Sequence, residues 1–188
     1  MADPVARIDA PARPLRFAWP VSLVLGAAIV ALSAQVAIPV PLSPVPMTLQ
    51  GLAVLLVGGL FGAAAGAGAL VLYLVLGIVG LPVFSPLGAP GIARILGPTG
   101  GYLLAFPVAA AVVGRIAQRD SLVRCFLGAF AAMIVIHLGG WAQLTLLTGG
   151  PSAAATTAVL PLVAQDLLKV VIATLVLWKT HQTLRPRI

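Results

Sequence analysis

Long apolar segments run along the chain, separated by short clusters of proline, glycine and charged residues. A run of roughly 20 apolar residues is long enough to cross the hydrocarbon core of a membrane as a helix. The second and third apolar runs divide near the small residues 62–66. The pattern predicts six membrane-spanning helices, at about 17–36, two within 48–81, 102–116, 126–147 and 159–178.

The connections between these runs differ in character. Segment 38–46 contains four closely spaced prolines, which forbid a regular helix. Segment 81–101 is a long loop rich in proline and glycine, and it carries Arg94. We therefore expect an all-α membrane protein with one transmembrane domain, 1–188. Its parts are an N-terminal segment (1–16), a six-helix bundle (17–180) and a C-terminal tail (181–188).

Composition supports this class. Hydrophobic residues make up 61% of the chain, and the mean hydropathy is +1.13, both above the values of soluble domains. The first apolar run has no clear cleavage site, so we interpret it as a retained span and not as a signal peptide. The single Cys125 excludes an intrachain disulfide and a multi-cysteine metal site. We expect an integral protein of a prokaryotic inner or plasma membrane.

Basic residues lie at the flanks of the predicted spans, not along one helix face, so the net charge of +7 does not indicate nucleic-acid binding. Cytoplasmic flanks of membrane proteins hold an excess of Lys and Arg. Six spans with both termini in the cytoplasm place nine of the eleven basic residues on that side. These nine are Arg7, Arg13, Arg16, Arg115, Arg119, Arg124, Lys179, Arg185 and Arg187.

The two remaining basic residues are Arg94, in an outer loop, and Lys169, in the last span. Lys169 lies three residues after Asp166, and a charge inside a membrane helix costs at least ~2.5–3.5 kcal/mol unless it faces protein or water. We expect Arg94, Asp166 and Lys169 to meet in an outward-facing ligand cavity. The alternatives are that Asp166 and Lys169 only neutralise each other, and that Arg94 is a solvated loop residue.

Other polar and small residues allow two interpretations each. Gln50 could bind a ligand or cap a helix. We expect Tyr73 and Tyr102 to be interfacial anchors, although Tyr102 follows GPTGG at 97–101 and could be positioned by it. His137 and Trp141 share one helix face, and a lone histidine in a bundle is more often an interhelical hydrogen-bonding residue than a ligand. The pair Ala27 and Ala31, spaced by four, could be internal packing or a docking face for another membrane protein.

Enzymatic motifs are missing from the sequence. It has no phosphate-binding loop of the form G-x-x-x-x-G-K-[ST], no H-E-x-x-H and no G-x-S-x-G. Its serines have no evident base and orienting group. We therefore expect neither an enzyme nor a metal site, and any ATP hydrolysis would belong to partners.

Short motifs distributed from the first span to the last resemble the BioY family, the biotin-specific substrate-binding S components of energy-coupling factor (ECF) vitamin transporters. They are AQVAIP at 34–39, PVPMTLQ at 44–50, LYL at 72–74 followed by Gly77, GLPVF at 80–84, GPTGGYL at 97–103 and DLLK at 166–169. The resemblance implies the six-helix S-component fold and capture of biotin from outside. It also implies association with a transmembrane coupling protein and two cytosolic ABC-type ATPases.

The chemistry of biotin suits the charged residues. Asp166 can accept from the ureido N–H groups, Lys169 can donate to the ureido carbonyl or balance the acid, and Arg94 can pair with the tail carboxylate. The reverse assignment, with Lys169 on the carboxylate, stays open. Apolar and aromatic side chains line most small-molecule sites, and the candidates are Phe84, Tyr102 and Trp141. No cofactor is expected besides the ligand.

Two other functions compete with this one. A proton-coupled secondary carrier for a small organic anion or vitamin would use Asp166 as the titrating group and His137 as a relay, although no inverted repeat is evident. A purely structural membrane subunit would leave the charged residues of the outer half without a role.

The predicted orientation can be tested by labelling of single cysteines from either side of the membrane. A cysteine at Arg119 and cysteines in both termini should react only from the cytoplasm, and one at Ser152 only from outside, because of the excess of basic residues on one side. Termini that react from opposite sides would contradict the six-span arrangement.

Overall fold

The computed structural model describes residues 18–41, 43–117 and 121–183. Six helices of at least twelve residues dominate this part of the chain, and two shorter helices and a π-turn complete it. In order, the helical elements are α1 (Trp19–Ala34), α2 (Gln50–Phe61), α3 (Ala63–Ile78), α4 (Ile92–Leu96), α5 (Gly100–Ile116), α6 (Leu122–Thr148), α7 (Pro151–Ala154), the π-turn η2 (Ala155–Val159) and α8 (Leu160–Thr183).

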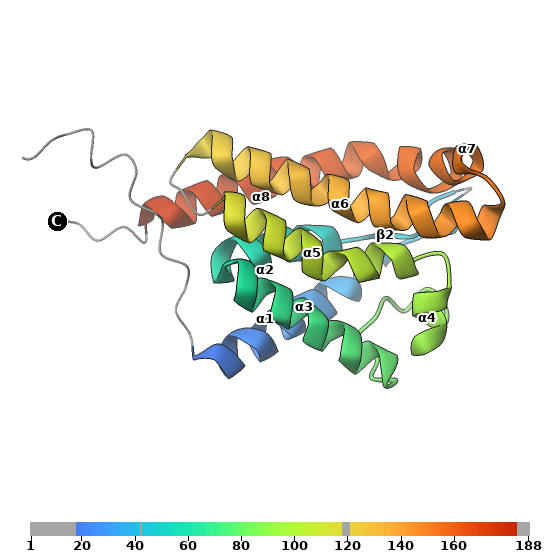
Figure 1. Cartoon of the computed structure of the whole chain (residues 1–188), viewed down its shortest axis with the longest axis horizontal. Coiled ribbons are helices and arrows are strands. Elements are labelled where there is room, and N and C mark those ends of the chain that lie inside the picture. Colours follow the sequence, from blue (N-terminus) through green and yellow to red (C-terminus); the bar gives the residue numbers. More distant parts are fainter. Residues whose placement is uncertain (1–17, 42, 118–120, 184–188) are drawn as a thin grey trace, which may run out of the picture.

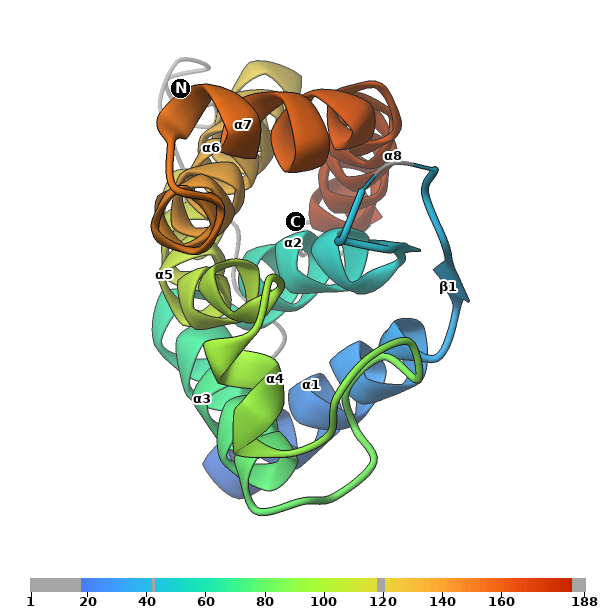
Figure 2. The same cartoon turned by 90° about the vertical axis from the view of Figure 1, so that its right-hand side faces the viewer.

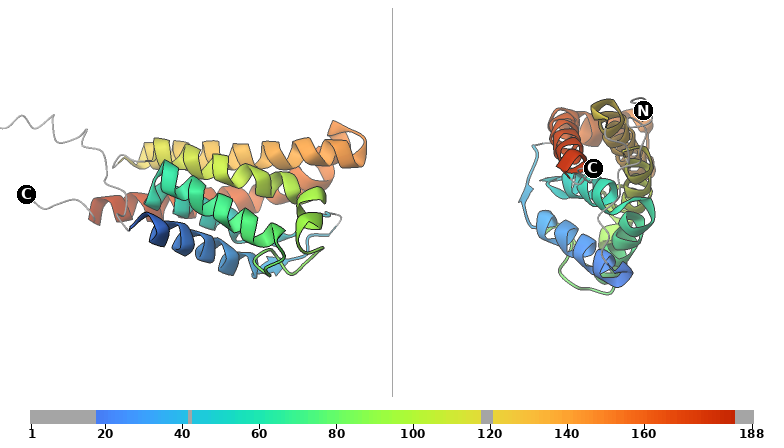
Figure 3. Two further views of the ribbon diagram at one scale, coloured as in Figure 1. Left: turned by 60° about the horizontal axis from the view of Figure 1, so that its bottom comes forward. Right: turned by 90° about the vertical axis from the view of Figure 1, so that its left-hand side faces the viewer.

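The six long helices run side by side in alternating directions (Figure 1). α5 packs against α2, α3 and α6, and α8 packs against α2 and α6. α1 lies along α3 at one flank of the bundle (Figure 3). The predicted all-α, six-helix architecture is therefore confirmed for the described residues.

Helix boundaries differ from the prediction mainly around the last two spans. α6 begins at Leu122, earlier than expected, and α7, η2 and α8 form a nearly continuous helix from Pro151 to Thr183. Only Gly149 and Gly150 separate this helix from α6, and Gly149 adopts a left-handed conformation with φ 75°. Such a glycine ends a helix and reverses the chain within very few residues.

The predicted hinge between the second and third spans is confirmed, and it consists of one residue. Gly62 alone joins α2 to α3, with φ 85° and ψ 170°. Only glycine adopts this combination without strain, because it has no Cβ. The single residue therefore turns the chain back on itself.

Small residues let neighbouring helices approach closely. A Cβ added to Gly139 on α6 would lie 2.5 Å from the backbone oxygen of Gly101 on α5, well inside the closest normal contact. Gly58 on α2 meets the backbone of Ala110 on α5 in the same way. In a membrane, such close approach gives van der Waals contact in place of a hydrophobic driving force.

The outward faces of the helices are apolar. Leu32 is 73% exposed, Leu146 is 85% exposed and Leu168 is 60% exposed, whereas the buried polar side chains lie inside the bundle. This distribution suits a lipid environment, where apolar atoms gain nothing by being buried. The helices Leu122–Thr148 and Pro151–Thr183 are long and apolar enough to span a membrane by themselves, and α1, α2, α3 and α5 are shorter apolar helices of 12 to 17 residues.

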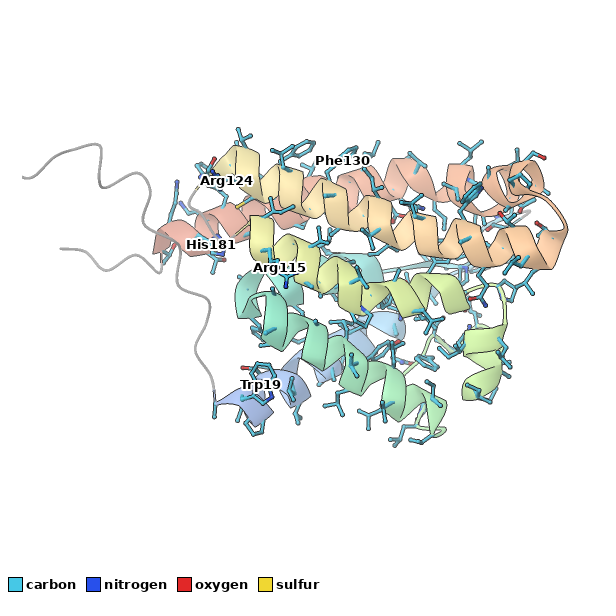
Figure 4. All side chains as sticks on the ribbon, in the orientation of Figure 1. Trp19, Arg115, Arg124, Phe130 and His181 are labelled. Carbon is cyan, nitrogen blue, oxygen red and sulfur yellow. The ribbon has the colours of Figure 1, made fainter. Side chains whose placement is uncertain are left out.

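The start of α1, the α2–α3 junction and the end of α8 lie at one end of the bundle (Figure 1). Arg115 and Arg124 lie at the same end, together with Trp19 and His181 (Figure 4). This arrangement agrees with the predicted grouping of basic residues. Lys179 lies near the end of α8, at this same end of the bundle. The other six residues of that prediction, Arg7, Arg13, Arg16, Arg119, Arg185 and Arg187, lie outside the described part of the chain.

The opposite end holds the long connections (Figure 2). The proline-rich connection between α1 and α2 is irregular, as predicted, except for two strands of two residues, β1 (Ala37–Ile38) and β2 (Met47–Thr48), which pair in antiparallel fashion. The glycine- and proline-rich connection between α3 and α5 contains the short helix α4, which carries Arg94. Both connections cover the ends of α2, α5 and α8, where the predicted site residues lie.

Candidate ligand-binding site

A cavity lies between α2, α5, α6 and α8, below the connection that contains α4. The space between its side chains is about 610 Å³, counted out to its open mouth, whereas the centre of a water molecule can occupy only about 60 Å³. The cavity is therefore narrow. The polar lining residues are Thr48, Gln50, Ser85, Arg94, Thr99, Tyr102, Gln165, Asp166 and Lys169.

The charged centre of the cavity is a three-residue network. The Lys169 ammonium donates to Asp166 Oδ1 at 2.6 Å, and His137 Nε2 lies 3.0 Å from Asp166 Oδ2. Asp166 and Lys169 come from the first half of α8, one turn apart, whereas His137 comes from α6. Each carboxylate oxygen thus has one donor, which compensates in part for the water that it loses on burial.

Arg94 is 5% exposed and is held by its own loop. Its Nη1 donates to the carbonyl oxygen of Leu87 at 2.6 Å, and its Nη2 donates to that of Ser85 at 2.5 Å. Its buried Nε has no hydrogen-bond partner among the described residues. Burial lowers the pKa of this guanidinium, but arginine remains protonated in proteins. Arg94 is therefore a fixed cation with donor capacity to spare, and it lines the cavity.

Gln50 begins α2 and is tied to two neighbours. Its Nε2 donates to the hydroxyl of Tyr73 on α3 at 2.7 Å, and its Oε1 accepts from Thr48 at 3.1 Å. The Thr48 hydroxyl also accepts from the backbone N–H of Gln50, at 3.3 Å. The buried amide is thereby held in one orientation beside the cavity, and both of its functional groups have a partner.

Two aromatic rings form apolar walls, and each rests on a glycine. Phe84 lies against Gly77 of α3 and meets Tyr73 edge to face, with centroids 5.4 Å apart. Tyr102 lies against Gly140 of α6, and a side chain at either glycine would collide with the ring. The Tyr102 hydroxyl is buried and has no partner among the described residues. The ring lines the cavity, and the hydroxyl keeps unused hydrogen-bonding capacity.

The connection that carries Arg94 is held to the bundle by two glutamines. Gln143 on α6 donates to the carbonyl oxygens of Ile95 at 2.8 Å and of Gly97 at 2.7 Å. Gln35, just after α1, donates to the carbonyl oxygen of Phe84 at 3.3 Å. These bonds fix the position of Arg94 and of Phe84 above the cavity.

Six of the seven predicted ligand-binding residues line this cavity: Gln50, Phe84, Arg94, Tyr102, Asp166 and Lys169. Trp141 does not, and its prediction as a lining residue is wrong. It lines a second, lateral groove between α6 and α8, is 37% exposed, and donates from Nε1 to the carbonyl oxygen of Pro151 at 3.1 Å. Helical spacing put Trp141 and His137 on one face, but that face of α6 turns towards the groove.

The predicted docking pair on α1 is also corrected in part. Ala27 is 3% exposed and packs in the core, so the side chain cannot form an outer contact face. Ala31 is half-buried and packs against the same core. The burial of Ala27 within the core, where α1 packs against α2 and α3, supports the interpretation of internal packing there.

Sequence reasoning missed the lining residues Gln165 and Ser85, and the role of Tyr73 behind the lining. Tyr73 was expected as an interfacial anchor, yet it is fully buried and holds Gln50. Gln165 precedes Asp166 and has a buried Oε1 without a partner among the described residues. Its polarity beside the charged pair was a usable signal. Ser85 holds Arg94 through its backbone oxygen, for which the sequence carries no signal.

The fold agrees with a solved membrane-transporter component. The chain superposes on a crystal structure described as the S-component for biotin from an ECF-type ABC transporter, with a TM-score of 0.76 over 87% of this chain and 90% of that one, at 22% identity. The architecture is therefore that of the membrane-embedded S components.

The model of the BioY family matches residues 11–186, so the chain belongs to the BioY family. It is 38% identical to a probable biotin transporter BioY of Pyrococcus horikoshii over 157 aligned residues. These residues are 83% of this chain and 92% of that protein. It is 35% identical over 140 residues to the biotin transporter BioY of Thermotoga maritima, covering 74% and 82%. The corresponding protein of Rhodobacter capsulatus is 37% identical over 164 residues, covering 80% and 85%.

Proposed function

We propose that this chain is the biotin-binding S component of an ECF-type vitamin importer, a transporter subunit and not an enzyme. Membership of the BioY family and the S-component fold support the assignment. The observation that carries it is the convergence of Asp166, Lys169 and Arg94 with two aromatic walls on one intramembrane cavity. Binding of radiolabelled biotin to the purified chain in detergent tests it directly.

The cavity has the groups that a ureido ring and a carboxylate require. Asp166 has lone pairs beyond those used by Lys169 and His137, because each carboxylate oxygen can accept two hydrogen bonds. Arg94 keeps its Nε–H free, and a guanidinium pairs well with a carboxylate. Phe84, Phe106 and Met133 supply apolar contact for the thiophane ring and the aliphatic tail.

Transport requires partners in this proposal. We infer that a transmembrane coupling protein and two cytosolic ATPases supply the energy, since the chain has no phosphate-binding loop. With both termini in the cytoplasm, the end of the bundle that carries Arg115 and Arg124 faces the ATPases, and the cavity opens to the outside. The site then loads before the partners act.

Replacing the buried acid tests the site. Asp166→Asn keeps the shape but removes the charge that attracts N–H donors and balances Lys169, so biotin affinity should fall by ~1.5–3 kcal/mol, roughly 10- to 150-fold. Isothermal titration of the purified variant gives this value. Arg124→Ala, an exposed basic residue at the far end of the bundle, is the control and should bind like the parent. Parent-like affinity of Asp166→Asn would mean that the charged pair is only structural.

A comparison of ligands isolates the role of Arg94. Arg94→Ala loses the salt bridge to a carboxylate and also the two bonds that hold its loop. Binding of biotin should therefore weaken by about 10-fold or more, whereas the already weaker binding of biotin methyl ester should change much less. A loop defect alone would weaken both ligands equally, so equal losses would remove Arg94 from the assignment.

We propose that the coupling protein docks on the membrane-facing side of α1. Because Ala27 is buried, Ala31 is the residue of the predicted pair that can take part in this contact. Ala31→Leu should reduce co-purification of the coupling protein and leave biotin binding intact, because bulk blocks close helix approach. Ala164→Leu, at an exposed position of α8, is the matched control. Unchanged co-purification would exclude Ala31, and loss of biotin binding would show that it packs internally.

A further inference from the structure

His137 is the one member of the charged network that does not line the cavity. It lines the lateral groove between α6 and α8, together with Trp141 and Leu138. We propose that His137 is a positioning residue of the ligand site: it holds the Asp166 carboxylate from the groove side, so that the free lone pairs of this carboxylate face the cavity. The inference rests on the proposed biotin-binding function and goes beyond it by assigning a role to a residue outside the ligand cavity.

The directions of the two hydrogen bonds support this role. Asp166 lines both the cavity and the groove, so its carboxylate lies in the wall between them. His137 contacts Oδ2 at 3.0 Å and lines the groove but not the cavity. Lys169 contacts Oδ1 at 2.6 Å and lines the cavity. Lys169 by itself would leave the carboxylate free to pivot about this one contact. The second donor, on another helix, fixes the plane of the carboxylate.

The His137 imidazole is placed to donate one hydrogen bond, to Asp166. A neutral histidine has one N–H donor and one acceptor nitrogen, and the contact with a carboxylate oxygen assigns the proton to Nε2. Nδ1 is buried and has no hydrogen-bond partner among the described residues. Tyr102 of the cavity wall meets the imidazole ring edge to face, with centroids 6.1 Å apart. The ring is therefore oriented by packing, and within the described part of the chain the polar contact that it makes is the bond to Asp166.

A purely structural role makes a different prediction. If the bond only joined α6 to α8, its loss would lower stability and leave the affinity for a ligand in the cavity unchanged. If the bond orients Asp166, its loss weakens binding only while the carboxylate is present. Residues that act through one another are not additive, and a double-mutant cycle measures this coupling.

The test uses three substitutions at His137 in the full-length, purified chain, with biotin affinity measured by titration calorimetry and stability by thermal unfolding. His137→Leu should weaken biotin binding roughly 5- to 30-fold, because Asp166 loses a donor. His137→Gln places an amide nitrogen near the position of Nε2 and should bind within about 3-fold of the parent. His137→Asn is too short to reach Asp166 and should resemble His137→Leu.

The cycle with Asp166→Asn completes the experiment. An amide has one acceptor oxygen, which Lys169 can occupy, so adding His137→Leu to Asp166→Asn should change affinity by less than about 2-fold. Leu138→Ala is the matched control, since Leu138 lines the same groove and is 55% exposed. It should leave affinity unchanged.

Three results would overturn the inference. Parent-like affinity of His137→Leu would show that Asp166 needs no second donor. Equal losses for the glutamine and asparagine variants would mean that the imidazole acts by its bulk, and this comparison holds even if the leucine variant does not fold. Additive losses with Asp166→Asn would show that His137 acts independently of the carboxylate. If the parent binds no biotin at all, the proposed function fails and this role fails with it; if the parent binds, only the positioning role is at stake.

Discussion

A buried carboxylate has to keep its donors, and this requirement organises the functional half of the molecule. Asp166 lies inside an apolar bundle, where removal of one partner from a buried ion pair costs roughly 3–5 kcal/mol because the other charge is left uncompensated. Lys169 on the same helix and His137 on α6 supply the donors. The network therefore joins α6 to α8 at the depth of the ligand cavity. It also leaves a carboxylate with spare lone pairs facing the ligand space.

The surrounding packing makes this placement possible. Glycines at the contacts of α5 with α2 and α6 bring the backbones close, so the helix ends converge around a narrow space. Glycine also provides room for the walls of the cavity, since the rings of Phe84 and Tyr102 each occupy the volume of a missing side chain. The small residues of this chain thus serve helix packing and the shape of the cavity together.

The loop that carries Arg94 shows how a cation can be fixed without an acidic partner. Among the described residues, Asp166 is the only acid, and it already has Lys169. Arg94 instead donates to the carbonyl oxygens of Ser85 and Leu87, and Gln143 holds the same loop from α6. Carbonyl dipoles orient the guanidinium but leave its charge unneutralised. An anionic group of a ligand can provide the missing charge, which is consistent with capture of a carboxylate.

Much of this protein was determined by the sequence alone. Long apolar runs can hide their backbone polar groups in a membrane only as helices, so the six helices follow from hydropathy, and the hinge near Gly62 follows from a cluster of small residues. The cost of a charge in a membrane marked Asp166 and Lys169 as candidate site residues, and the distribution of basic residues marked Arg94 as an exception on the outer side. The inference of the helices succeeds because it depends on local composition, and the site residues stay a prediction that rests on the cost of burying charge.

The tertiary structure decided which face of each helix turns inward. Periodicity placed His137 and Trp141 on one face of α6, but only packing against α8 showed that this face borders a lateral groove and not the cavity. In the same way, only the packing of α1 against α2 and α3 showed that Ala27 is buried. In a membrane protein, lipid-facing and core-facing surfaces are both apolar, so hydrophobic pattern cannot separate them. Only contacts between distant segments resolve that ambiguity, and they also set the bond between His137 and Asp166.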